Sequence, residues 1–241
     1  MKKLMLATAL LALTAGAAAA QTTRMGTEGA YPPYNFINDK GEVDGFEREL
    51  GDKMCEMAGL TCEWVTTDWD SIIPNLQSGN YDTIIAGMSI TEERKQVLAF
   101  TQNYIPPVSS GYMAASADAN IGEGAVVAAQ VGTIQAGHVA ASGATLLEFA
   151  TPDETVAAVR NGEADAVFAD KGYLLPIASE SAGALVLLDA DVKIGDGVGM
   201  GLRQSDTELR DKFDATITTM KGDGTLNTMI KKWFGDGAEV F

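Results

Sequence analysis

Two stretches of this sequence, about eighty residues apart, share one order of a helix, a glycine and a buried strand. When their glycines are aligned, four pairs of positions fall together: Gly79 with Gly162, Asp82 with Asp165, Ala86 with Ala169, and Gly87 with Asp170. The shared residues are few, and ordinary α/β sequences also carry this pattern. Two such units nevertheless predict two similar lobes. The ends of their strands would then face one cleft, where open α/β sheets bind ligands.

The first unit is predicted to contain a helix and then a short strand. Asp70 or Ser71 is placed to cap the helix, and Gly79 supplies the left-handed residue that ends it. Residues 82–86 form an apolar run that is long enough for one buried strand.

Arg94 lies in the first turn of the next predicted helix, after the candidate cap residues Ser89 and Thr91. Glu92 and Glu93 suit the positive end of a helix, but the charge of Arg94 opposes the helix dipole. Two explanations stay open: an anion lies beside Arg94, or Arg94 is an ordinary exposed charge.

The rest of the chain continues to alternate strands and helices. Thr151 is predicted to begin a helix as its cap, with Pro152 in the first turn and Glu154 completing a capping box. The other predicted elements are strands over 24–27, 62–66 and 125–130, an extended loop over 30–36, and helices over 46–58, 134–142, 206–220 and 225–234. This alternation predicts an α/β protein.

The segment Gly195–Leu202 alternates glycine with other residues, as some dinucleotide-binding sequences do. No helix begins directly after it, however, so an extended crossover strand is favoured over a nucleotide site.

Residues 1–20 have the features of a secretory signal peptide. Two lysines precede an apolar run over 4–13, which is too short to span a bilayer comfortably. Ala18 and Ala20 are the small residues expected before a cleavage site, which places the mature N-terminus at Gln21. No cysteine lies near that point to carry a lipid anchor, so we expect a soluble, exported protein.

The formal net charge is −16, and it becomes −18 once the two lysines of the signal peptide are removed. Such an acidic chain repels nucleic acid and anionic membranes, so neither is expected as a partner.

Cys55 and Cys62 are the only cysteines, and export makes a disulfide the first hypothesis. A metal site is not expected, because His138 is the only histidine and no carboxylates surround the cysteine pair. His138 itself is predicted to be a solvated helix residue.

Several motifs then identify a family. They are GTEGAYPPYNF, VDGFERELGDKMC, the stretch from Trp69 through TEERKQVLAFTQNY, and GVGMGLRQSDTELRDKF with DGTLNTMIKKWF. In this order they resemble the periplasmic solute-binding proteins of polar amino-acid ABC transporters. The resemblance is weakest over 114–129 and 172–191.

The resemblance implies two α/β lobes, each a mixed sheet flanked by helices, joined by two crossover strands and closing on a ligand by hinge motion. Lobe 1 would comprise residues 21–105 plus 200–241, and lobe 2 residues 110–190. The hinge crossovers would lie near 105–111 and 189–199. The family works without a cofactor, and the implied protein is a monomer that passes an amino acid to a membrane permease.

The resemblance also implies the ligand-binding residues. Arg94 would clamp the α-carboxylate with its bidentate fork, and Asp170 would take the α-ammonium. Tyr31 and Trp69 would enclose the ligand side chain between their rings. The full implied set is Glu28, Tyr31, Trp69, Gly87, Met88, Ser89, Arg94, Thr133 and Asp170, in which Ser89, Thr133 and the backbone of Gly87 add donors to the carboxylate.

Glu28 bears on the choice of ligand. A carboxylate at this place reads the distal cation in the lysine/arginine/ornithine-binding branch, and the Cys55–Cys62 spacing also resembles that branch. Glu28 could alternatively pair with a neighbouring lysine or arginine. Gly87 departs from the branch, which commonly has serine there, so longer ligands such as opine-type arginine conjugates, or another polar amino acid, stay open.

Two other functions compete with binding of a basic amino acid. A periplasmic cyclohexadienyl dehydratase shares the fold, but its substrate lacks a cationic tail. A sensor or scaffold module of the same fold is disfavoured because no attached domain is found. No nucleophilic triad is expected with a single histidine.

Overall fold

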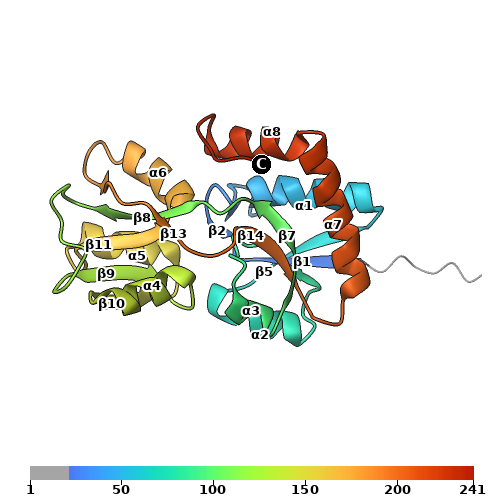
Figure 1. Ribbon diagram of the computed structural model, residues 1–241, viewed down its shortest axis with the longest axis horizontal. Coiled ribbons are helices and arrows are strands. Elements are labelled where there is room, and N and C mark those ends of the chain that lie inside the picture. Colours follow the sequence, from blue (N-terminus) through green and yellow to red (C-terminus); the bar gives the residue numbers. More distant parts are fainter. Residues whose placement is uncertain (1–21) are drawn as a thin grey trace, which may run out of the picture.

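Two mixed β-sheets, each flanked by helices, organise residues 22–241, the part of the chain that this computed structural model describes (Figure 1). The predicted two-lobed α/β fold is confirmed. The predicted signal peptide and its cleavage site lie outside the described residues. Within residues 22–241, we find no helix that is both long and apolar enough to cross a membrane.

The first sheet has the strand order β5-β1-β6-β14-β7. Helices α1, α7 and α8 contribute to the core on one face, and α2 packs on the other. Its elements are β1 (Thr23–Thr27), α1 (Phe46–Ala58), β5 (Cys62–Thr66), α2 (Ile72–Gln77), β6 (Thr83–Ile84), α3 (Glu92–Lys95), β7 (Ala99–Ile105), β14 (Val198–Leu202), α7 (Thr207–Gly222) and α8 (Thr225–Phe234).

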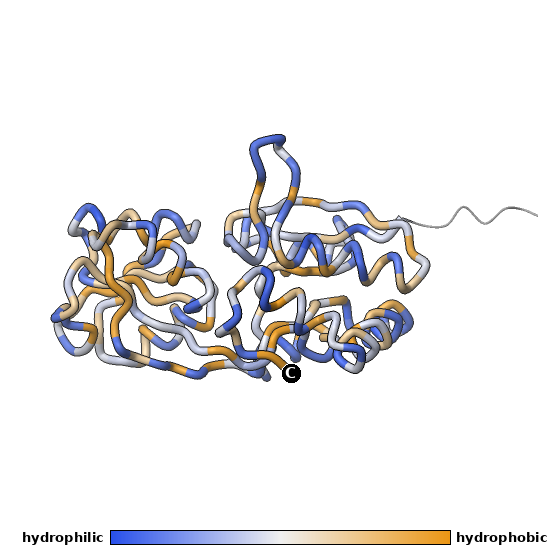
Figure 2. Tube along the Cα trace, turned by 90° about the horizontal axis from the view of Figure 1, so that it is seen from above, coloured by the Kyte–Doolittle hydropathy of each residue, from blue (hydrophilic) through white to orange (hydrophobic). Residues whose placement is uncertain are grey.

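The second sheet has the order β10-β9-β11-β8-β12, and β13 also pairs with β8. Helices α5 and α6 pack on one face, and α4 packs on the other. Its elements are β8 (Ser109–Ala114), β9 (Val126–Gln130), α4 (Ile134–Ser142), β10 (Thr145–Phe149), α5 (Pro152–Arg160), β11 (Ala166–Asp170), α6 (Lys171–Glu180), β12 (Val186–Leu187) and β13 (Val192–Lys193). Figure 2 shows that the most hydrophobic segments run through the interior of each lobe.

The chain passes between the two sheets twice. Residues 106–108 connect β7 to β8, and residues 194–197 connect β13 to β14. The predicted crossovers contain these connections, and the Gly-rich segment does form an extended strand, β14. The predicted lobe bounds describe which residues move together during hinge closure. They remain a prediction, because they concern the motion between two conformations.

The two repeated units occupy equivalent places. Strands β6 and β11 are each third in their sheet, parallel to one neighbour and antiparallel to the other. Asp82 and Asp165 precede these strands, and each exchanges a pair of hydrogen bonds with the backbone of the parallel neighbouring strand, β1 or β9. The backbone N–H of Arg24 donates to Asp82 Oδ2 at 2.9 Å, and that of Val126 donates to Asp165 Oδ2 at 2.8 Å. The return bonds, from the Asp backbone to the Arg24 and Val126 carbonyls, measure 2.9 and 2.8 Å.

Helix boundaries follow the caps that the sequence carries. Helix α1 ends at Gly59 in the left-handed conformation, and Thr151 and Glu154 form the predicted capping box. The prediction for the first unit is wrong in one detail. A short 3-10 turn, η1 (Trp69–Ser71), precedes α2, and neither Asp70 nor Ser71 caps it with its side chain.

Two further predictions need correction. The extended loop over 30–36 takes part in a small antiparallel sheet of β2 (Ala30–Tyr31), β3 (Asn35–Ile37) and β4 (Val43–Asp44). His138 is half-buried rather than solvated, because its ring packs 5.0 Å from that of Phe168.

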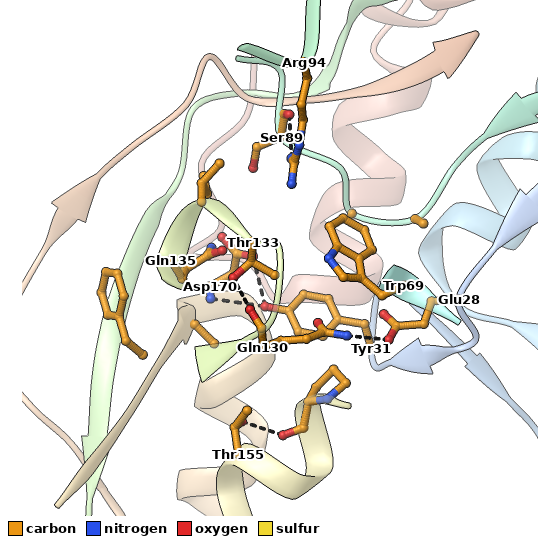
Figure 3. Close-up of a pocket in the computed structure, with 16 residues that line it drawn as sticks. Glu28, Tyr31, Trp69, Ser89, Arg94, Gln130, Thr133, Gln135, Thr155 and Asp170 are labelled. Carbon is orange, nitrogen blue, oxygen red and sulfur yellow. Dashed lines mark hydrogen bonds between the residues drawn. The ribbon is translucent and has the colours of Figure 1, made fainter. Parts of the chain in front are cut away.

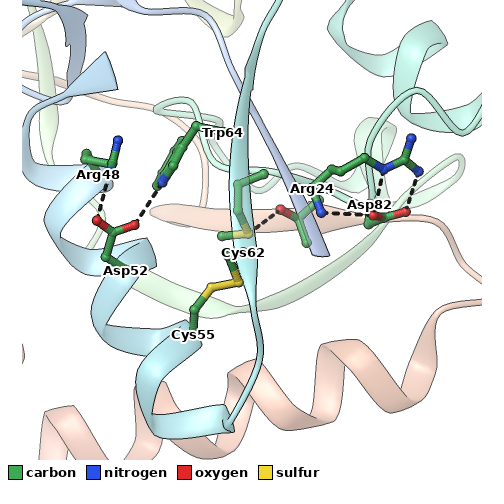
Figure 4. The surroundings of a disulfide bond; sticks show 9 residues. Arg24, Arg48, Asp52, Cys55, Cys62, Trp64 and Asp82 are labelled. Carbon is green, nitrogen blue, oxygen red and sulfur yellow. Dashed lines mark hydrogen bonds and ion pairs between the residues drawn. A yellow bond between two sulfur atoms is a disulfide. The ribbon is translucent and has the colours of Figure 1, made fainter. Parts of the chain in front are cut away.

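The predicted disulfide joins Cys55 of α1 to Cys62 of β5 (Figure 4). Asp52 lies one turn before Cys55 and accepts from the indole N–H of Trp64 at 2.9 Å, which ties the same helix to the same strand. Among the described residues, no cluster of three or more His, Cys, Asp and Glu side chains is arranged to hold a metal ion.

Removing this disulfide should lower the free energy of unfolding without changing the fold. The two cysteines are 7 residues apart, and closing so short a loop stabilises by about 2–3 kcal/mol in the chain-entropy model. Urea unfolding of Cys55→Ala/Cys62→Ala against the wild type measures the loss. A reducing agent should lower the wild-type midpoint and leave that of the variant unchanged. Equal midpoints for the two oxidised proteins would contradict the prediction.

Candidate functional site

One cavity lies between the lobes at the carboxyl ends of the central strands (Figure 3). Glu28 follows β1, Gly87 follows β6, Gln130 ends β9 and Asp170 ends β11. The cavity has about 490 Å³ of empty space, open solvent included. Its lining consists of Glu28, Tyr31, Trp69, Ala86, Gly87, Ser89, Arg94, Gln130, Thr133, Ile134, Gln135, Pro152, Thr155, Phe168, Ala169 and Asp170. Eight of the nine residues implied by the resemblance therefore come together, and Met88 does not.

Arg94 provides the positive end of the cavity. Its backbone N–H donates to the cap oxygen of Thr91 at 3.1 Å, which fixes the start of α3. Its guanidinium donates to the carbonyl of Ser89 at 2.9 Å and to that of Gly132, in the other lobe, at 3.2 Å. The guanidinium also lies 5.4 Å from the ring centroid of Trp69.

Burial lowers the pKa of Arg94 to about 10, with Glu93 and Asp170 acting in the opposite direction. A guanidinium has five N–H groups, and two carbonyls do not use them all. Its buried charge is therefore suited to a bidentate anion such as a carboxylate.

Ser89 and Thr133 flank Arg94 from the two lobes. Ser89 is 7% exposed. Thr133 caps α4: its Oγ1 accepts from the N–H of Ala136 at 3.1 Å and donates to the carbonyl of Gln130 at 2.7 Å. Because the hydroxyl is used in this way, the backbone N–H groups at the start of α4 are the donors that this position offers to an anion.

Asp170 provides a carboxylate on one side of the cavity (Figure 3). The hydroxyl of Tyr31 donates to Asp170 Oδ2 at 2.9 Å, and that of Ser110 lies 3.5 Å from Oδ1. Burial raises the pKa of Asp170, while the bonds from Tyr31, Ser110 and Gln135 and the charge of Arg94 oppose that rise. This buried carboxylate lines the cavity and suits a cation such as an ammonium group.

The two implied aromatic walls differ in their surroundings. Trp69 is 8% exposed and lies on one side of the cavity, between Arg94 and Glu28 (Figure 3). Tyr31 stacks one face on Tyr173, with ring centroids 4.4 Å apart and planes 17° from parallel. One face of Tyr31 is therefore not available to a ligand, the ring of Tyr34 lies 5.3 Å away, and the hydroxyl of Tyr31 is also engaged.

Glu28 provides the negative end of the cavity, away from Arg94 (Figure 3). Gln130 Nε2, from the other lobe, donates to Glu28 Oε1 at 2.6 Å and to the carbonyl of Ala150 at 3.0 Å. Glu28 does not pair with a lysine or arginine side chain in the described part of the chain, so that alternative is not what the structure shows.

Burial raises the pKa of Glu28 to about 7. The hydrogen bond from Gln130 opposes this rise, and the charges of Asp68, Glu47 and Asp153 add to it. A second cation at this end of the cavity would relieve that accumulation of negative charge.

Two expectations about the strand end after β6 need correction. The side chain of Met88 is fully buried with Ile72 and Leu76 in the core and does not reach the cavity. The backbone N–H of Gly87 donates to Glu47 Oε1 at 2.6 Å, so it is not free for a ligand carboxylate. Gly87 has φ +61°, and a Cβ there would lie 3.5 Å from the Tyr31 ring.

Three polar residues of the cavity were missed: Gln130, Gln135 and Thr155. Gln130 ends the strand that was predicted over 125–130, so the strand-end reasoning applied to Asp170 points to it equally. Gln135 follows Thr133 in the first turn of α4, and its Nε2 donates to Ser110 Oγ at 3.1 Å.

Comparison with known proteins agrees with this geometry. The chain matches the model of bacterial extracellular solute-binding proteins, family 3, over residues 23–236. It is 31% identical to the lysine/arginine/ornithine-binding periplasmic protein of Escherichia coli (strain K12) over 253 residues, covering 97% of each chain.

Solved structures are also similar. A periplasmic His/Glu/Gln/Arg/opine family-binding protein from Silicibacter pomeroyi, in complex with lysine, is 72% identical with a TM-score of 0.89 and covers 91% of this chain and 100% of its own. An ancestral amino acid-binding protein, a precursor of cyclohexadienyl dehydratase, is 29% identical with a TM-score of 0.78 and covers 88% of this chain and 95% of its own. The predicted resemblance is confirmed: this chain belongs to the bacterial extracellular solute-binding proteins, family 3.

Proposed function

We propose that this protein binds a basic amino acid between its lobes and delivers it to the membrane permease of an ABC importer. The observation that carries the proposal is a set of three charged groups that line one cavity: Arg94, Asp170 on one side and Glu28 on the other, away from Arg94 (Figure 3). An amino acid with a cationic side chain has the complementary set of charges: a carboxylate, an α-ammonium group and a distal cation. Lysine in the related Silicibacter pomeroyi structure supports this choice.

The proposal assigns a partner to each group. Arg94, with the start of α4, holds the α-carboxylate, and Asp170 holds the α-ammonium. Trp69 and Tyr31 enclose the side chain. Glu28, held by Gln130, reads the distal cation. Because these groups come from both lobes, the ligand completes its contacts when the hinge closes.

A screen of all amino acids on protein stripped of endogenous ligand tests the proposal. Thermal shift followed by calorimetry should show stabilisation by arginine, lysine or ornithine, because a ligand that binds only the folded state raises its stability. Stabilisation by glutamate or glutamine alone would reject a basic ligand.

The affinity for a basic ligand should rise with pH up to about pH 7. Burial in the cavity raises the pKa of Glu28 to about 7, so at lower pH a proton must leave before a cation can pair with it. The affinity for arginine should therefore fall by up to about tenfold per pH unit below 7. Calorimetry between about pH 5 and pH 8 measures this slope. Glutamine binding, and arginine binding to Glu28→Gln, should lack it; an equal slope for both ligands would contradict the role of Glu28.

A dehydratase activity is the second candidate, because a carboxyl group with a pKa of about 7 is suited to donate a proton. Prephenate, however, carries two carboxylates and no cationic tail. Glu28 and the neighbouring charges of Asp68, Asp153 and Glu47 would repel the second carboxylate. We therefore propose binding without catalysis. Turnover of prephenate or arogenate above a protein-free blank would overturn this part of the proposal.

We also propose that the chain is exported to the periplasm and cleaved between Ala20 and Gln21. The signal-like residues 1–20 and the periplasmic relatives support this. Mass spectrometry of the protein recovered from the periplasm should give a mature chain that begins at Gln21.

A further inference from the structure

Glu47 is a fully buried carboxylate that does not line the cavity. It lies in the first turn of α1, and burial raises its pKa. A charge buried in this way is costly unless several donors satisfy it. Glu47 has three: the backbone N–H of Gly87 donates to Oε1 at 2.6 Å, Asn35 Nδ2 donates to Oε2 at 2.7 Å, and the hydroxyl of Tyr104 also donates to Oε1.

Asn35 extends this arrangement to the loop after β1. Its side chain is fully buried, and its Oδ1 accepts from the backbone N–H of Gly29 at 2.7 Å. Three hydrogen bonds therefore connect Gly29, Asn35, Glu47 and Gly87 in that order, and we call this chain of hydrogen bonds the relay. Gly29 adjoins Glu28, and Gly87 begins the turn that carries Ser89.

The polarity of the relay is fixed by its two ends. The backbone N–H groups of Gly29 and Gly87 can only donate. Asn35 must turn its oxygen toward Gly29, so its NH₂ group donates toward Glu47. The central group must then accept from both sides, which an ionised carboxylate does and an amide does not.

We propose that Glu47 is a positioning residue for the ligand site: it holds the loops after β1 and β6 so that Glu28 and the Gly87–Ser89 turn face one ligand. Glu47 acts through Gly29 and Gly87 and does not touch the ligand. The inference rests on the proposed function, since it assumes that a basic amino acid is the ligand.

The substitution Glu47→Gln breaks the relay at one side whichever way its amide points. The NH₂ group of the new glutamine would face either the NH₂ group of Asn35 or the backbone N–H of Gly87. Two donors cannot form a hydrogen bond with each other. A buried polar group left without a partner destabilises the arrangement that contains it. Without a ligand, the loops after β1 and β6 of the variant can move away from their binding positions. Ligand binding must then return them to those positions, which weakens the affinity. Arginine should therefore bind about ten- to a hundredfold more weakly, and glutamine should lose less, because it does not use Glu28.

The double variant Asn35→Asp/Glu47→Gln should restore the hydrogen bonds of the relay, because the carboxylate and the amide change places. The new carboxylate at position 35 would accept from Gly29 and from the new amide at position 47, whose oxygen would accept from Gly87 and Tyr104. Arginine affinity should return to within about threefold of wild type, or about 0.65 kcal/mol. The matched control Asn35→Asp places two carboxylates against each other and should weaken arginine binding on its own.

Calorimetry with arginine and glutamine, beside thermal unfolding, separates positioning from a purely structural role. Glu47→Gln with wild-type arginine affinity would overturn the inference, as would a folded double variant that stays as weak as the single one. If Glu47→Gln does not fold, the double variant decides in the same way. A wild type that binds no basic amino acid would instead refute the proposed function.

Discussion

Arg94→Ala is expected to abolish the binding of every amino acid, whatever its side chain. The guanidinium is the buried cation of the cavity, and its partners in the described part of the chain are two backbone carbonyls. A ligand carboxylate that enters the closed cavity without this cation is left buried and unpaired. Removing one partner of a buried charge pair typically costs about 3–5 kcal/mol, which corresponds to a loss of affinity of more than about a hundredfold.

Calorimetry of stripped protein with arginine, lysine and glutamine measures this loss. Arg94→Lys is the matched control, because it keeps the charge and removes the planar fork. It should bind more weakly than wild type and more tightly than Arg94→Ala. Thermal unfolding without ligand shows whether the variants fold. A folded Arg94→Ala protein with unchanged affinity would refute the assignment of the carboxylate site.

Glu28→Gln is expected to remove the preference for a basic ligand while leaving the rest of the site in place. Hydrogen bonds to charged groups contribute about 1.5–3 kcal/mol, so arginine and lysine should bind about ten- to a hundredfold more weakly. Glutamine affinity should change little, because its side chain brings no charge to this end. The substitution also removes the carboxyl group with a pKa of about 7, so the pH dependence should disappear with it.

Asp68→Asn is the matched control for the loss of one negative charge. Asp68 is exposed and contributes to the field at Glu28 without lining the cavity. Its loss should affect arginine and glutamine binding weakly, since solvent screens exposed charges. A Glu28→Gln protein that still prefers arginine over glutamine would show that another residue reads the distal charge.

The sequence predicts much of the fold because local patterns dominate it. Helices α1 and α8 begin and end at the predicted residues, since each has a clear apolar face and a glycine after its last turn. The aligned units at Gly79 and Gly162 anticipate the equivalent strands β6 and β11. The small sheet of β2, β3 and β4 was not predicted, because its pairs join short segments that carry no periodicity.

The site was predicted less completely than the fold. Resemblance to a family indicates which positions meet at the cleft, and eight of them line the cavity. It does not show which hydrogen bonds are already used, as the Gly87 N–H and the Tyr31 hydroxyl illustrate. The spacing of apolar residues in α1 does predict that Glu47 is buried. It lies three residues before Leu50 and seven before Met54, on the buried face of α1.

The central claim is that three charged groups read three charges of one ligand, and analogues of arginine that each lack one charge test it most directly. Agmatine lacks the carboxylate opposite Arg94, and citrulline lacks the distal cation opposite Glu28. In calorimetry at about pH 8, arginine should bind most tightly, and both analogues should bind at least about tenfold more weakly. In Glu28→Gln the gap between arginine and citrulline should close. Equal wild-type affinities for arginine and citrulline, or for arginine and agmatine, would contradict the account.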